Sequence, residues 1–410
     1  MITASVERRA RELAESGLLP AYVYDLAALR THLADVRAAV PTATAEVFYA
    51  AKANPDARVL AALFPYVDGV EVASGGELEH VRAALPRARI AFGGPGKTDA
   101  ELALAVRHAE RVHVESPWEL TRLAAAAAVA GREVDVLLRV NLTVAPTGAA
   151  LAMNGPFGMD PDLLAECPPI LRRNPRLRLR GLHAHLASGL DAAAMAARAA
   201  DVLAWALPWL DELGPGTGGA GREVNLGGGM AVDYGRPGAR FDWPAYGARL
   251  AALGTPGLRL RIEPGRALTA YAGWYVTVVL DVKRAHGEWY AVLAGGTHHL
   301  RTPVTKGHDQ PCTVLARPRG DGPSVRGEPV TLVGQLCTPK DVFARRVPTG
   351  RLAAGDVVAF ALAGAYAWNI SHHDFLMHPK PHFAYVDGPG ASGGDAESAG
   401  RPMRRVVRPD

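Results

Sequence analysis

The first two thirds of the chain alternate between short apolar strand patterns and longer stretches whose apolar residues recur at helical spacing. We predict eight strands, at Val47–Lys52, Gly69–Ser74, Ile90–Gly94, Arg111–Ser116, Val134–Asn141, Leu179–Leu186, Glu223–Gly229 and Leu258–Pro264. Helical patterns fill the connections, at Glu77–Leu85, Asp99–His108, Trp118–Ala130, Asp191–Leu213 and Trp243–Leu253. Strands joined by helices run parallel, and eight units over about 220 residues match a (β/α)₈ barrel. An open doubly wound sheet alternates in the same way, so both folds remain open.

The pattern changes after about residue 270, where strands follow one another with little helix between them. These strands are predicted at Trp274–Lys283, Trp289–Ala294, Pro329–Gln335, Asp356–Leu362 and His382–Val386. We therefore predict an α/β chain with a TIM-type barrel at residues 21–270 and a mostly β C-terminal domain at residues 271–386, which residues 1–20 join. Residues 387–410 are rich in Gly, Ser, Pro and Arg and are predicted to be disordered.

Charge and cysteine content exclude several classes of protein. Of 410 residues, 45 are Lys or Arg and 41 are Asp or Glu, and the densest basic run, Arg401 to Arg408, lies in the tail. This pattern predicts no nucleic-acid partner. No apolar run approaches the roughly 18 residues of a membrane span, and residues 1–20 lack the apolar segment of a signal peptide. Three cysteines without metal-like spacing predict a location in the reducing cytoplasm.

Polar and glycine residues interrupt the apolar strands mainly where the strands end. They include Lys52, Ser74, Asn141, His185, Gly227 to Gly229 and Glu263. The carboxyl ends of the strands carry the active site in (β/α)₈ barrels. We therefore expect these residues to meet at one rim.

Lys52 closes the predicted strand Val47–Lys52 and would point into the barrel mouth. Burial disfavours the charged form of an amine and so lowers the pKa of a lysine. A neutral amine can form a Schiff base with a carbonyl compound. Taken alone, a lysine at this place can instead extend its charged end to solvent.

Gly227-Gly228-Gly229 follow the predicted seventh strand. Glycines let the backbone approach an anion closely and offer N–H groups to it. Gly265-Arg266, after the eighth strand, would supply the other half of the same site, because these two loops often bind phosphate in such barrels. A tight turn between strand and helix is the alternative explanation of the three glycines.

Glu263, at the end of the eighth strand, is a candidate partner for a pyridine nitrogen. A buried carboxylate keeps such a nitrogen protonated through a charge-assisted hydrogen bond. The protonated ring is the better electron sink for a carbanion. The alternative is an ordinary ion pair with a neighbouring arginine.

His183 and His185 are two apart on one strand and so share a face, an arrangement that also holds zinc in some barrel hydrolases. No convincing third and fourth ligand is evident, and we predict no metal. The pairs His298-His299 and His372-His373 suit shared ligation poorly, because adjacent side chains on a strand point to opposite faces.

Two segments of the C-terminal domain carry further candidate groups. Cys337, in Cys337-Thr338-Pro339-Lys340-Asp341, can be a proton donor or an inert, half-buried thiol. Tyr366, in Gly364-Ala365-Tyr366, can donate its phenol to a phosphate or simply pack.

In their shared order and spacing these segments resemble the fold-type III enzymes that use pyridoxal 5′-phosphate (PLP), whose barrel is alanine racemase-like. The resemblance is to the diaminopimelate/ornithine/arginine decarboxylase family and covers roughly residues 15–386. The matching segments are Tyr22-Val23-Tyr24-Asp25, Tyr49-Ala50-Ala51-Lys52-Ala53-Asn54, Ala73-Ser74-Gly75-Gly76-Glu77-Leu78, Phe157-Gly158-Met159, Gly181-Leu182-His183-Ala184-His185, Asn225-Leu226-Gly227-Gly228-Gly229, Glu263-Pro264-Gly265-Arg266, Cys337 with Asp341, and Gly364-Ala365-Tyr366.

The resemblance implies a role for each matched position. Lys52 would carry PLP as a Schiff base, His185 would stack on the ring, and Glu263 would pair with the ring nitrogen. The phosphate would be held by Ser188, Gly227, Gly228, Gly229, Gly265, Arg266 and Tyr366. Cys337 would protonate the α-carbon, and Cys337 and Asp341 would enter the active site of the opposite subunit. The resemblance therefore implies a homodimer with shared active sites.

The segment Trp368–Pro379 is similar to a subgroup found in siderophore biosynthesis, whose members decarboxylate diamino acids or their citrate conjugates. Lys340 would add positive charge at the substrate end and suit extra carboxylates, unless it faces solvent. Three positions depart from the wider family: Glu71 stands where Asp is common, Ala187 precedes Ser188 where Gly is usual, and Pro156 stands where Lys is frequent. These departures weaken the case for ordinary lysine biosynthesis.

We therefore predict PLP-dependent decarboxylation of a small amino-acid substrate, namely a diamino acid or its citryl conjugate. The alternatives are decarboxylation of diaminopimelate, racemisation of an amino acid, zinc-dependent hydrolysis using His183 and His185, and a non-catalytic relative that only binds partners. Glu263 argues against a racemase, because racemases of this fold tend to place an arginine at the ring nitrogen.

Overall fold

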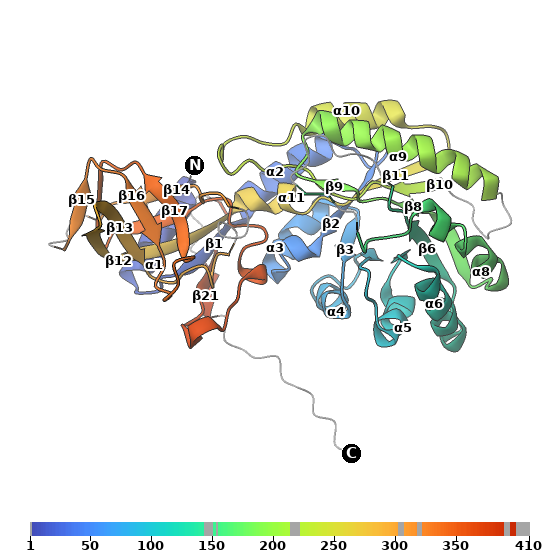
Figure 1. Cartoon of the computed structure of the whole chain (residues 1–410), viewed down its shortest axis with the longest axis horizontal. Coiled ribbons are helices and arrows are strands. Elements are labelled where there is room, and N and C mark those ends of the chain that lie inside the picture. Colours follow the sequence, from blue (N-terminus) through green and yellow to red (C-terminus); the bar gives the residue numbers. More distant parts are fainter. Residues whose placement is uncertain are drawn as a thin grey trace, which may run out of the picture. The chain divides into compact units, whose positions relative to one another are not determined.

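The structure is a computed structural model that describes residues 2–142, 151–152, 155–213, 222–301, 307–317, 322–388 and 394–398. The chain forms two compact units, coloured along the sequence in Figure 1. The barrel unit comprises residues 29–232 and 239–268. The β-rich unit comprises residues 1–28, 233–238 and 269–410.

Eight parallel strands close into a barrel, as predicted. In order around the barrel they are β10 (Arg222–Asn225), β11 (Leu258–Ile262), β2 (Glu46–Ala50), β3 (Gly69–Val72), β4 (Ile90–Phe92), β5 (Arg111–Val114), β6 (Val134–Arg139) and β8 (Leu177–His183). The open sheet is excluded because the last strand, β11, pairs with the first, β2, with Arg261 opposite Glu46.

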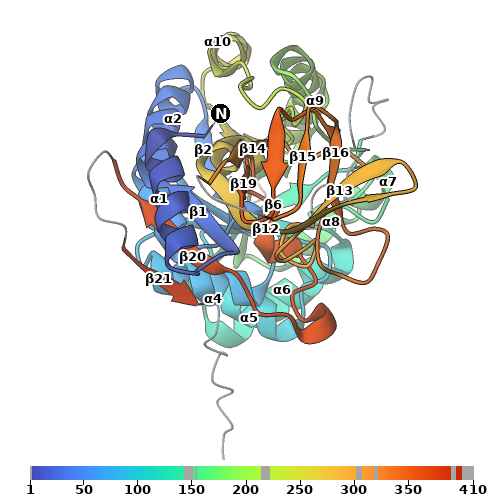
Figure 2. The same ribbon diagram turned by 90° about the vertical axis from the view of Figure 1, so that its left-hand side faces the viewer.

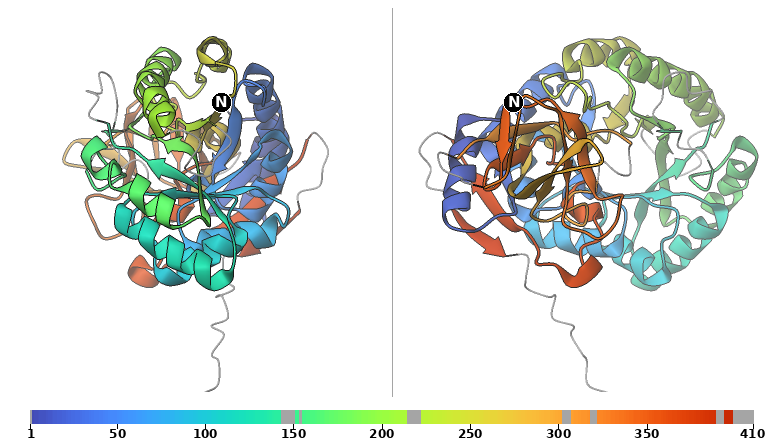
Figure 3. Two further views of the ribbon diagram at one scale, coloured as in Figure 1. Left: turned by 90° about the vertical axis from the view of Figure 1, so that its right-hand side faces the viewer. Right: turned by 60° about the vertical axis from the view of Figure 1, so that its left-hand side comes forward.

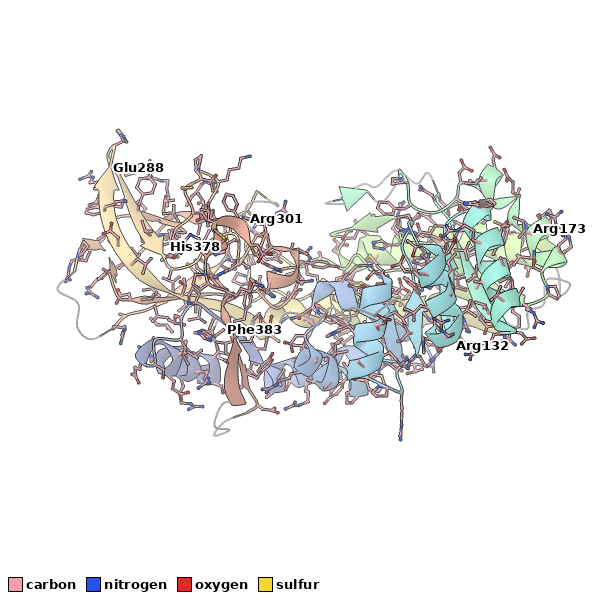
Figure 4. The ribbon with its side chains drawn as sticks, turned by 90° about the horizontal axis from the view of Figure 1, so that it is seen from below. Arg132, Arg173, Glu288, Arg301, His378 and Phe383 are labelled. Carbon is pink, nitrogen blue, oxygen red and sulfur yellow. The ribbon has the colours of Figure 1, made fainter. Side chains whose placement is uncertain are left out.

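Helices surround these strands (Figure 3, left). They are α2 (Leu26–Ala39), α3 (Ala57–Leu63), α4 (Gly75–Ala84), α5 (Asp99–His108), α6 (Pro117–Ala130), α7 (Pro161–Leu164), α8 (Cys167–Arg173), α9 (Ala192–Leu213), α10 (Trp243–Leu253) and α11 (Arg266–Thr269). Exposed arginines lie at the outer ends of two of them: Arg132 just after α6 and Arg173 at the end of α8 (Figure 4).

Side-chain caps fix where three of these helices begin. The hydroxyl oxygens of Ser74, Thr98 and Ser116 each accept the backbone N–H three residues ahead, at the starts of α4, α5 and α6. Such a cap satisfies one of the N–H groups that a helix leaves unpaired at its first turn. Ser74, which interrupts its strand pattern at the predicted rim, therefore has a local structural role.

The opposite end of the barrel is held by a buried ion-pair network. Arg261 is 0% exposed, and its Nη2 lies 2.7 Å from Glu46 Oε2 and 3.3 Å from Glu223 Oε1. Its guanidinium also lies 3.8 Å from the centre of the Phe48 ring. Arg111 pairs with Glu223 from another strand at 3.1 Å. These contacts connect β2, β5, β10 and β11 across the barrel interior.

The β-rich unit is built on a nine-stranded sheet, whose strands are visible in Figure 2. Its main path is β17 (Val342–Val347), β16 (Val330–Val333), β13 (Glu288–Leu293), β12 (Gly273–Ala285), β1 (Ala21–Asp25), β20 (His382–Val386) and β21 (Gly394–Ser398). β19 (Val357–Phe360) pairs with β12 and with β14 (Cys312–Leu315). Glu288 at the start of β13 and Phe383 in β20 are labelled in Figure 4.

A helix and several strands enclose the core of this unit. The helix α1 (Ala4–Glu15) contributes Val6, Ala10 and Leu13, which are buried with Trp274 and Val276 of β12. Strands β1, β14, β19 and β20 supply the other members of the cluster.

Strand β1 does not lie in the barrel, although the predicted barrel range began at residue 21. It runs antiparallel to β12 and parallel to β20 in the β-rich sheet. The predicted range misplaced it because a short buried strand carries no local signal of its partner. The strands β14, β17, β15 (Ser324–Arg326) and β18 (Arg351–Ala353) were not predicted, since three to six residues give little pattern.

Most of the predicted disordered tail, residues 387–410, lies outside the described residues. Within that range the backbone of β21 pairs antiparallel with β20. Among the helices of the described residues, none is long and apolar enough to cross a membrane.

Replacing Arg261 tests the network at the base of the barrel. Arg261→Met should lower the free energy of unfolding by about 3 kcal/mol, because it leaves buried carboxylates with fewer cationic partners. Arg259→Met is the matched control, since Arg259 is exposed on the same strand. It should change stability by no more than about 0.5 kcal/mol. Urea denaturation measures both, and equal effects of the two variants would contradict the assignment.

Candidate active site

Lys52 lies at the carboxyl end of β2, but it does not belong to the strand. The strand ends at Ala50, two residues earlier than predicted, and residues Ala51–Ala53 form a single 3₁₀ turn, η1. The Lys52 Nζ donates to Glu71 Oε2 at 2.9 Å and to Oε1 at 3.2 Å. The Lys52 side chain is 46% exposed and that of Glu71 is 5% exposed. The amine is therefore accessible and is held by a buried carboxylate.

The other lysine of the barrel unit is in a different situation. Lys97 is buried, and its Nζ donates to Glu119 Oε1 and to the carbonyl oxygens of Gly94 and His113, each at 2.7 Å. All three of its N–H groups therefore have partners. This leaves Lys52 as the better nucleophile.

Glu263 follows β11 and is surrounded by polar groups from neighbouring strands. Asn225 Nδ2 donates to Glu263 Oε1 at 2.6 Å, and His183 Nε2 lies 3.4 Å from Oε2. Burial alone would raise the pKa of Glu263, but the imidazoles of His113 and His183 and the amide of Asn225 outweigh it and hold the pKa well below its usual range. Arg261 pairs with Glu46 instead. Glu263 is thus a buried, ionised carboxylate.

His185 contacts the glycine loop. Its Nδ1 accepts the N–H of Gly228 at 3.1 Å. Burial, followed by the charge of Lys52, lowers the pKa of His185 to about 3. The imidazole is therefore neutral, and because Nδ1 is an acceptor we assign its proton to Nε2.

The three glycines are required by close packing. A Cβ on Gly227 would lie 2.6 Å from the Cβ of His185, and one on Gly228 would lie 2.4 Å from the carbonyl oxygen of Glu263. Gly229 has a φ of +114°, and a Cβ there would lie 2.3 Å from the carbonyl oxygen of Ala187. No other residue fits this loop without displacing its neighbours.

The N–H groups of the glycine loop are not equally available. Gly227 donates to Asn225 Oδ1 at 2.9 Å and Gly228 donates to His185. Within the described part of the chain, the N–H of Gly229 has no such partner. It is the amide of the three that can bind an anion.

The remaining phosphate candidates of the barrel unit lie on adjacent segments. Ser188 belongs to the two-residue strand β9 (Ala187–Ser188), next to the carbonyl that packs on Gly229. Gly265 and Arg266 come after Glu263 and Pro264; Arg266 begins α11, and the Gly265 carbonyl accepts the N–H of Leu268. The barrel unit thus contains Lys52 and all the residues that were predicted to contact the ring or the phosphate of PLP, except Tyr366.

Four predicted residues lie in the β-rich unit. Cys337 and Lys340 are exposed, and Tyr366 is half-buried with a φ of +48°. Asp341 is buried, and its carboxylate accepts the N–H groups of Thr297 at 2.6 Å and Leu336 at 2.8 Å. This placement fits a role in shaping the Cys337 loop better than the predicted contact to substrate.

The histidine pair His298-His299 lies in a turn, and not on a strand. The two rings are 4.0 Å apart, so the expectation that they point to opposite faces is wrong. His298 is also near His378, with ring centres 5.4 Å apart. Arg301 and His378, which lie in this part of the unit, are labelled in Figure 4.

Sequence reasoning gave no role to Asn225, which it quoted only as part of a matching segment, and it missed His113. Asn225 bridges Glu263 and the glycine loop, and His113 lies beside Glu263 with His183. His113, His183 and Glu263 each offer an atom of a metal-ligand type, all within 4.8 Å of one another. The zinc alternative was built on His183 and His185, and the structure instead groups His183 with His113. The available signal was a polar residue in the middle of an apolar strand, Val112-His113-Val114.

Comparison with known proteins decides between these chemistries. Residues 26–270 match the family model described as the pyridoxal-binding domain of pyridoxal-dependent decarboxylases. The chain belongs to this family. It is a decarboxylase, and its cofactor is PLP.

Relatives and solved structures agree with the family. The chain is 39% identical to the 2-[(L-alanin-3-ylcarbamoyl)methyl]-2-hydroxybutanedioate decarboxylase of Staphylococcus aureus, over 89% of this chain and 93% of that protein. It is 32% identical to the diaminopimelate decarboxylase of Deinococcus radiodurans, over 88% of each. A crystal structure of Helicobacter pylori diaminopimelate decarboxylase shares the fold, with a TM-score of 0.81, 22% identity and coverage of 92% and 94%.

The barrel unit of this decarboxylase fits PLP on its own geometry. An accessible amine, an ionised carboxylate and an available loop amide match the aldehyde, the ring nitrogen and the phosphate of the cofactor. His113, whose ring nitrogens are buried without hydrogen-bond partners in the described part of the chain, and His183, whose Nε2 lies 3.4 Å from Glu263 Oε2, line the carboxylate. The residues present therefore fit the group that the family uses.

The buried histidines predict how the stability of the apoprotein depends on pH. Burial lowers the pKa of several histidines, among them His113, His183, His185, His298 and His299. The unfolded chain binds these protons near pH 6.5 and the native chain does not. The free energy of unfolding should therefore not depend on these histidines above pH 6.5. Below pH 6.5 it should fall, by up to about 1.4 kcal/mol per pH unit for each histidine.

Chemical denaturation at pH 7.5, 6.5 and 5.5 measures this slope. His298→Leu should flatten it by about 1.4 kcal/mol per pH unit, because the pKa of His298 is lowered to about 4. His286→Asn, at an exposed turn of the same unit, should leave it unchanged. A stability that is constant between pH 7.5 and 5.5 would show that these imidazoles are not buried in the native protein.

Proposed function

We propose that this enzyme decarboxylates an amino acid whose side chain bears additional carboxylates. The observation that carries the proposal is the 39% identity, over 89% of the chain, to the S. aureus enzyme. The name of that enzyme describes a citrate joined through an amide to the 3-amino group of 2,3-diaminopropionate. We assign the same substrate class to this chain, in siderophore or other secondary-metabolite biosynthesis. Diaminopimelate is the second candidate, supported by the 32% identical relative.

Lys52 is the residue that we assign to the covalent attachment of PLP. Its amine must lose a proton before it can attack a carbonyl carbon. Burial raises the pKa of Glu71, against the opposing effect of Lys52, so this carboxyl group can accept that proton. Glu71 contacts the Lys52 Nζ directly, at 2.9 Å. The longer side chain of Glu71, in place of the usual Asp, therefore still reaches the amine.

The electrostatics of the site favour loss of carbon dioxide. Bound PLP supplies an electron sink for the electron pair left on the α-carbon. Glu263, ionised and buried, would hold a proton on the ring nitrogen of the bound cofactor. Neutral His185 would stack on the ring without adding a positive charge that would compete for Glu263. Ser188, Gly229, Gly265 and Arg266 would hold the phosphate on the barrel side, and Gly227 and Gly228 give the loop its shape.

The β-rich unit supplies the remaining groups in this proposal. Cys337, exposed at the tip of its loop, donates a proton to the α-carbon, and Tyr366 donates to the phosphate. Lys340 places a positive charge where the extra carboxylates lie. We propose that Cys337 and Lys340 act on the site of a second subunit in a homodimer. The proposed location is the cytoplasm, supported by three free cysteines.

A substrate panel tests the proposed activity. PLP-loaded enzyme is incubated with diaminopimelate, ornithine, lysine, diaminobutyrate, diaminopropionate and the citryl-diaminopropionate conjugate, and carbon dioxide loss is followed by mass spectrometry. We expect kcat/KM for the conjugate to exceed that for diaminopimelate by at least about 100-fold, because charged groups that pair with the citryl carboxylates are left unpaired by a substrate without the citryl group. A preference for diaminopimelate would overturn the substrate assignment.

The role of Lys340 is tested by charge removal. Lys340→Gln should raise KM for the citryl conjugate about tenfold with little change in kcat, since it contacts a part of the substrate that does not react. The KM for diaminopropionate should not change. Lys283→Gln removes an exposed charge elsewhere in the same unit and serves as the control. An unchanged KM in Lys340→Gln would show that Lys340 faces solvent.

Subunit mixing tests the shared site. Lys52→Ala and Cys337→Ala enzymes should each be nearly inactive. After mixing and exchange, half of the dimers are hybrids with one of two intact sites, so activity should recover to about a quarter of wild type. No recovery, with hybrid dimers demonstrated by native mass spectrometry, would place Cys337 in the site of its own subunit.

A further inference from the structure

The buried imidazole of His113 has no role in the reaction described so far. His113 lies in the middle of β5, is 0% exposed, and neither of its ring nitrogens has a hydrogen-bond partner in the described part of the chain. A buried polar group without a partner costs roughly 1–3 kcal/mol. An apolar residue would avoid this cost, so the imidazole calls for an explanation.

We propose that His113 is a positioning residue for Glu263, which it holds as the proton acceptor of the cofactor ring nitrogen. The inference rests on the proposed function only in so far as Glu263 faces that nitrogen. It does not depend on which amino acid the enzyme decarboxylates.

Geometry brings one imidazole to each oxygen of Glu263. His113 Nε2 lies 3.8 Å from Oε1, and His183 Nε2 lies 3.4 Å from Oε2. The two rings are 4.3 Å apart and inclined by only 31°, so they form a tilted stack beside the carboxylate. Asn225 Nδ2 donates to Oε1 as well. A shift of less than one ångström would bring His113 within hydrogen-bond distance, so the carboxylate is confined from both sides.

The two imidazoles have the same protonation state. Burial lowers the pKa of His113 and of His183, and their proximity to each other lowers that of His113 further. Both rings are therefore neutral, and each can direct one N–H toward the carboxylate. A neutral N–H donor favours the ionised form of a carboxyl group without adding a charge that would compete with the ring nitrogen.

Other charged groups near His113 also affect Glu263 and Glu71. The charged and titratable groups around His113 are His183, Glu263, Arg261 and Lys97, and Glu71 lies on the other side of Gly93. A Cβ on Gly93 would lie 3.2 Å from Glu71 Oε1 and 3.5 Å from His113 Nδ1. Glu71 and His113 therefore both lie close to Gly93. The charge of Glu263 raises the pKa of Glu71, so a carboxylate that is fixed at Glu263 also favours proton acceptance at Glu71.

The test compares two substitutions of His113. His113→Leu introduces an apolar side chain of similar length that has no N–H group. His113→Gln is also similar in length but keeps an N–H donor. His108→Leu is the control, because His108 is an exposed histidine at the C-terminal end of α5 in the same unit, and burial lowers its pKa as well. Circular dichroism and thermal melts confirm that each variant is folded.

Two readouts need no substrate. The first is the affinity of the apoprotein for PLP, which we expect to fall about tenfold in His113→Leu, the equivalent of one pKa unit. The second is the ¹⁵N NMR signal of ring-labelled PLP, whose protonated fraction should titrate about one pH unit lower in His113→Leu than in wild type. In His113→Gln both the PLP affinity and the titration should lie close to those of wild type, and His108→Leu should match wild type.

A third variant separates this inference from the assignment of Glu263. Glu263→Gln should reduce ring protonation more than any substitution of His113. If Glu263→Gln changes the NMR signal and His113→Leu does not, His113 has no positioning role. If Glu263→Gln leaves the signal unchanged, Glu263 does not face the nitrogen, and both assignments are wrong. If His113→Leu fails to fold, wild-type affinity and titration in a folded His113→Ala variant would equally refute the proposal.

Discussion

The pairing of β11 with β2 is the constraint on which the site depends. These strands are the last and first of the barrel, and their parallel register sets Arg261 beside Glu46 and Ile262 beside Val47. The same pairing continues beyond the strands, where the N–H of Ala50 donates to the carbonyl of Pro264 at 3.2 Å. It thereby brings the segments that carry Lys52 and Glu263 to one rim, although they are far apart in the sequence. If the barrel were open, the amine and the carboxylate would lie at opposite edges of a sheet.

Carboxylates are paired differently at the two ends of the closed barrel. Glu46 and Glu223 lie at or near the amino ends of β2 and β10, where Arg111 and Arg261 neutralise their carboxylates, and the interior is held by paired charges. At the carboxyl ends the charges are only partly compensated. Glu263 is held by amide and imidazole groups and has no cation within salt-bridge distance in the described structure. An ionised carboxylate that is stabilised in this way remains able to bind a proton on a cofactor.

Strand–helix alternation is a local pattern that repeats eight times, so the sequence predicted parallel α/β units, and the resemblance of the motifs to fold-type III enzymes favoured the barrel over the open sheet. The sequence also predicted Lys52, His185, the glycine loop and Glu263 as one group, since each follows the end of a strand, and their cofactor roles stay predictions. It did not predict His113, because a single polar residue inside Arg111–Val114 has no visible partner until the barrel brings β5 near β11. For the same reason β1 was placed in the wrong unit, since its neighbours β12 and β20 come more than two hundred residues later. His298-His299 were misjudged because a turn cannot be told from a strand in so short a segment.

Attachment of PLP to Lys52 is the central claim, and reduction of the purified enzyme with borohydride tests it most directly. Reduction converts a Schiff base between PLP and a lysine into a stable bond, which survives proteolysis and can be located by peptide mass spectrometry. We predict a single modified peptide that contains Lys52, and its loss in Lys52→Arg. Stoichiometric modification of another lysine, such as Lys97, or bound PLP that is released unreduced, would contradict this account of the site.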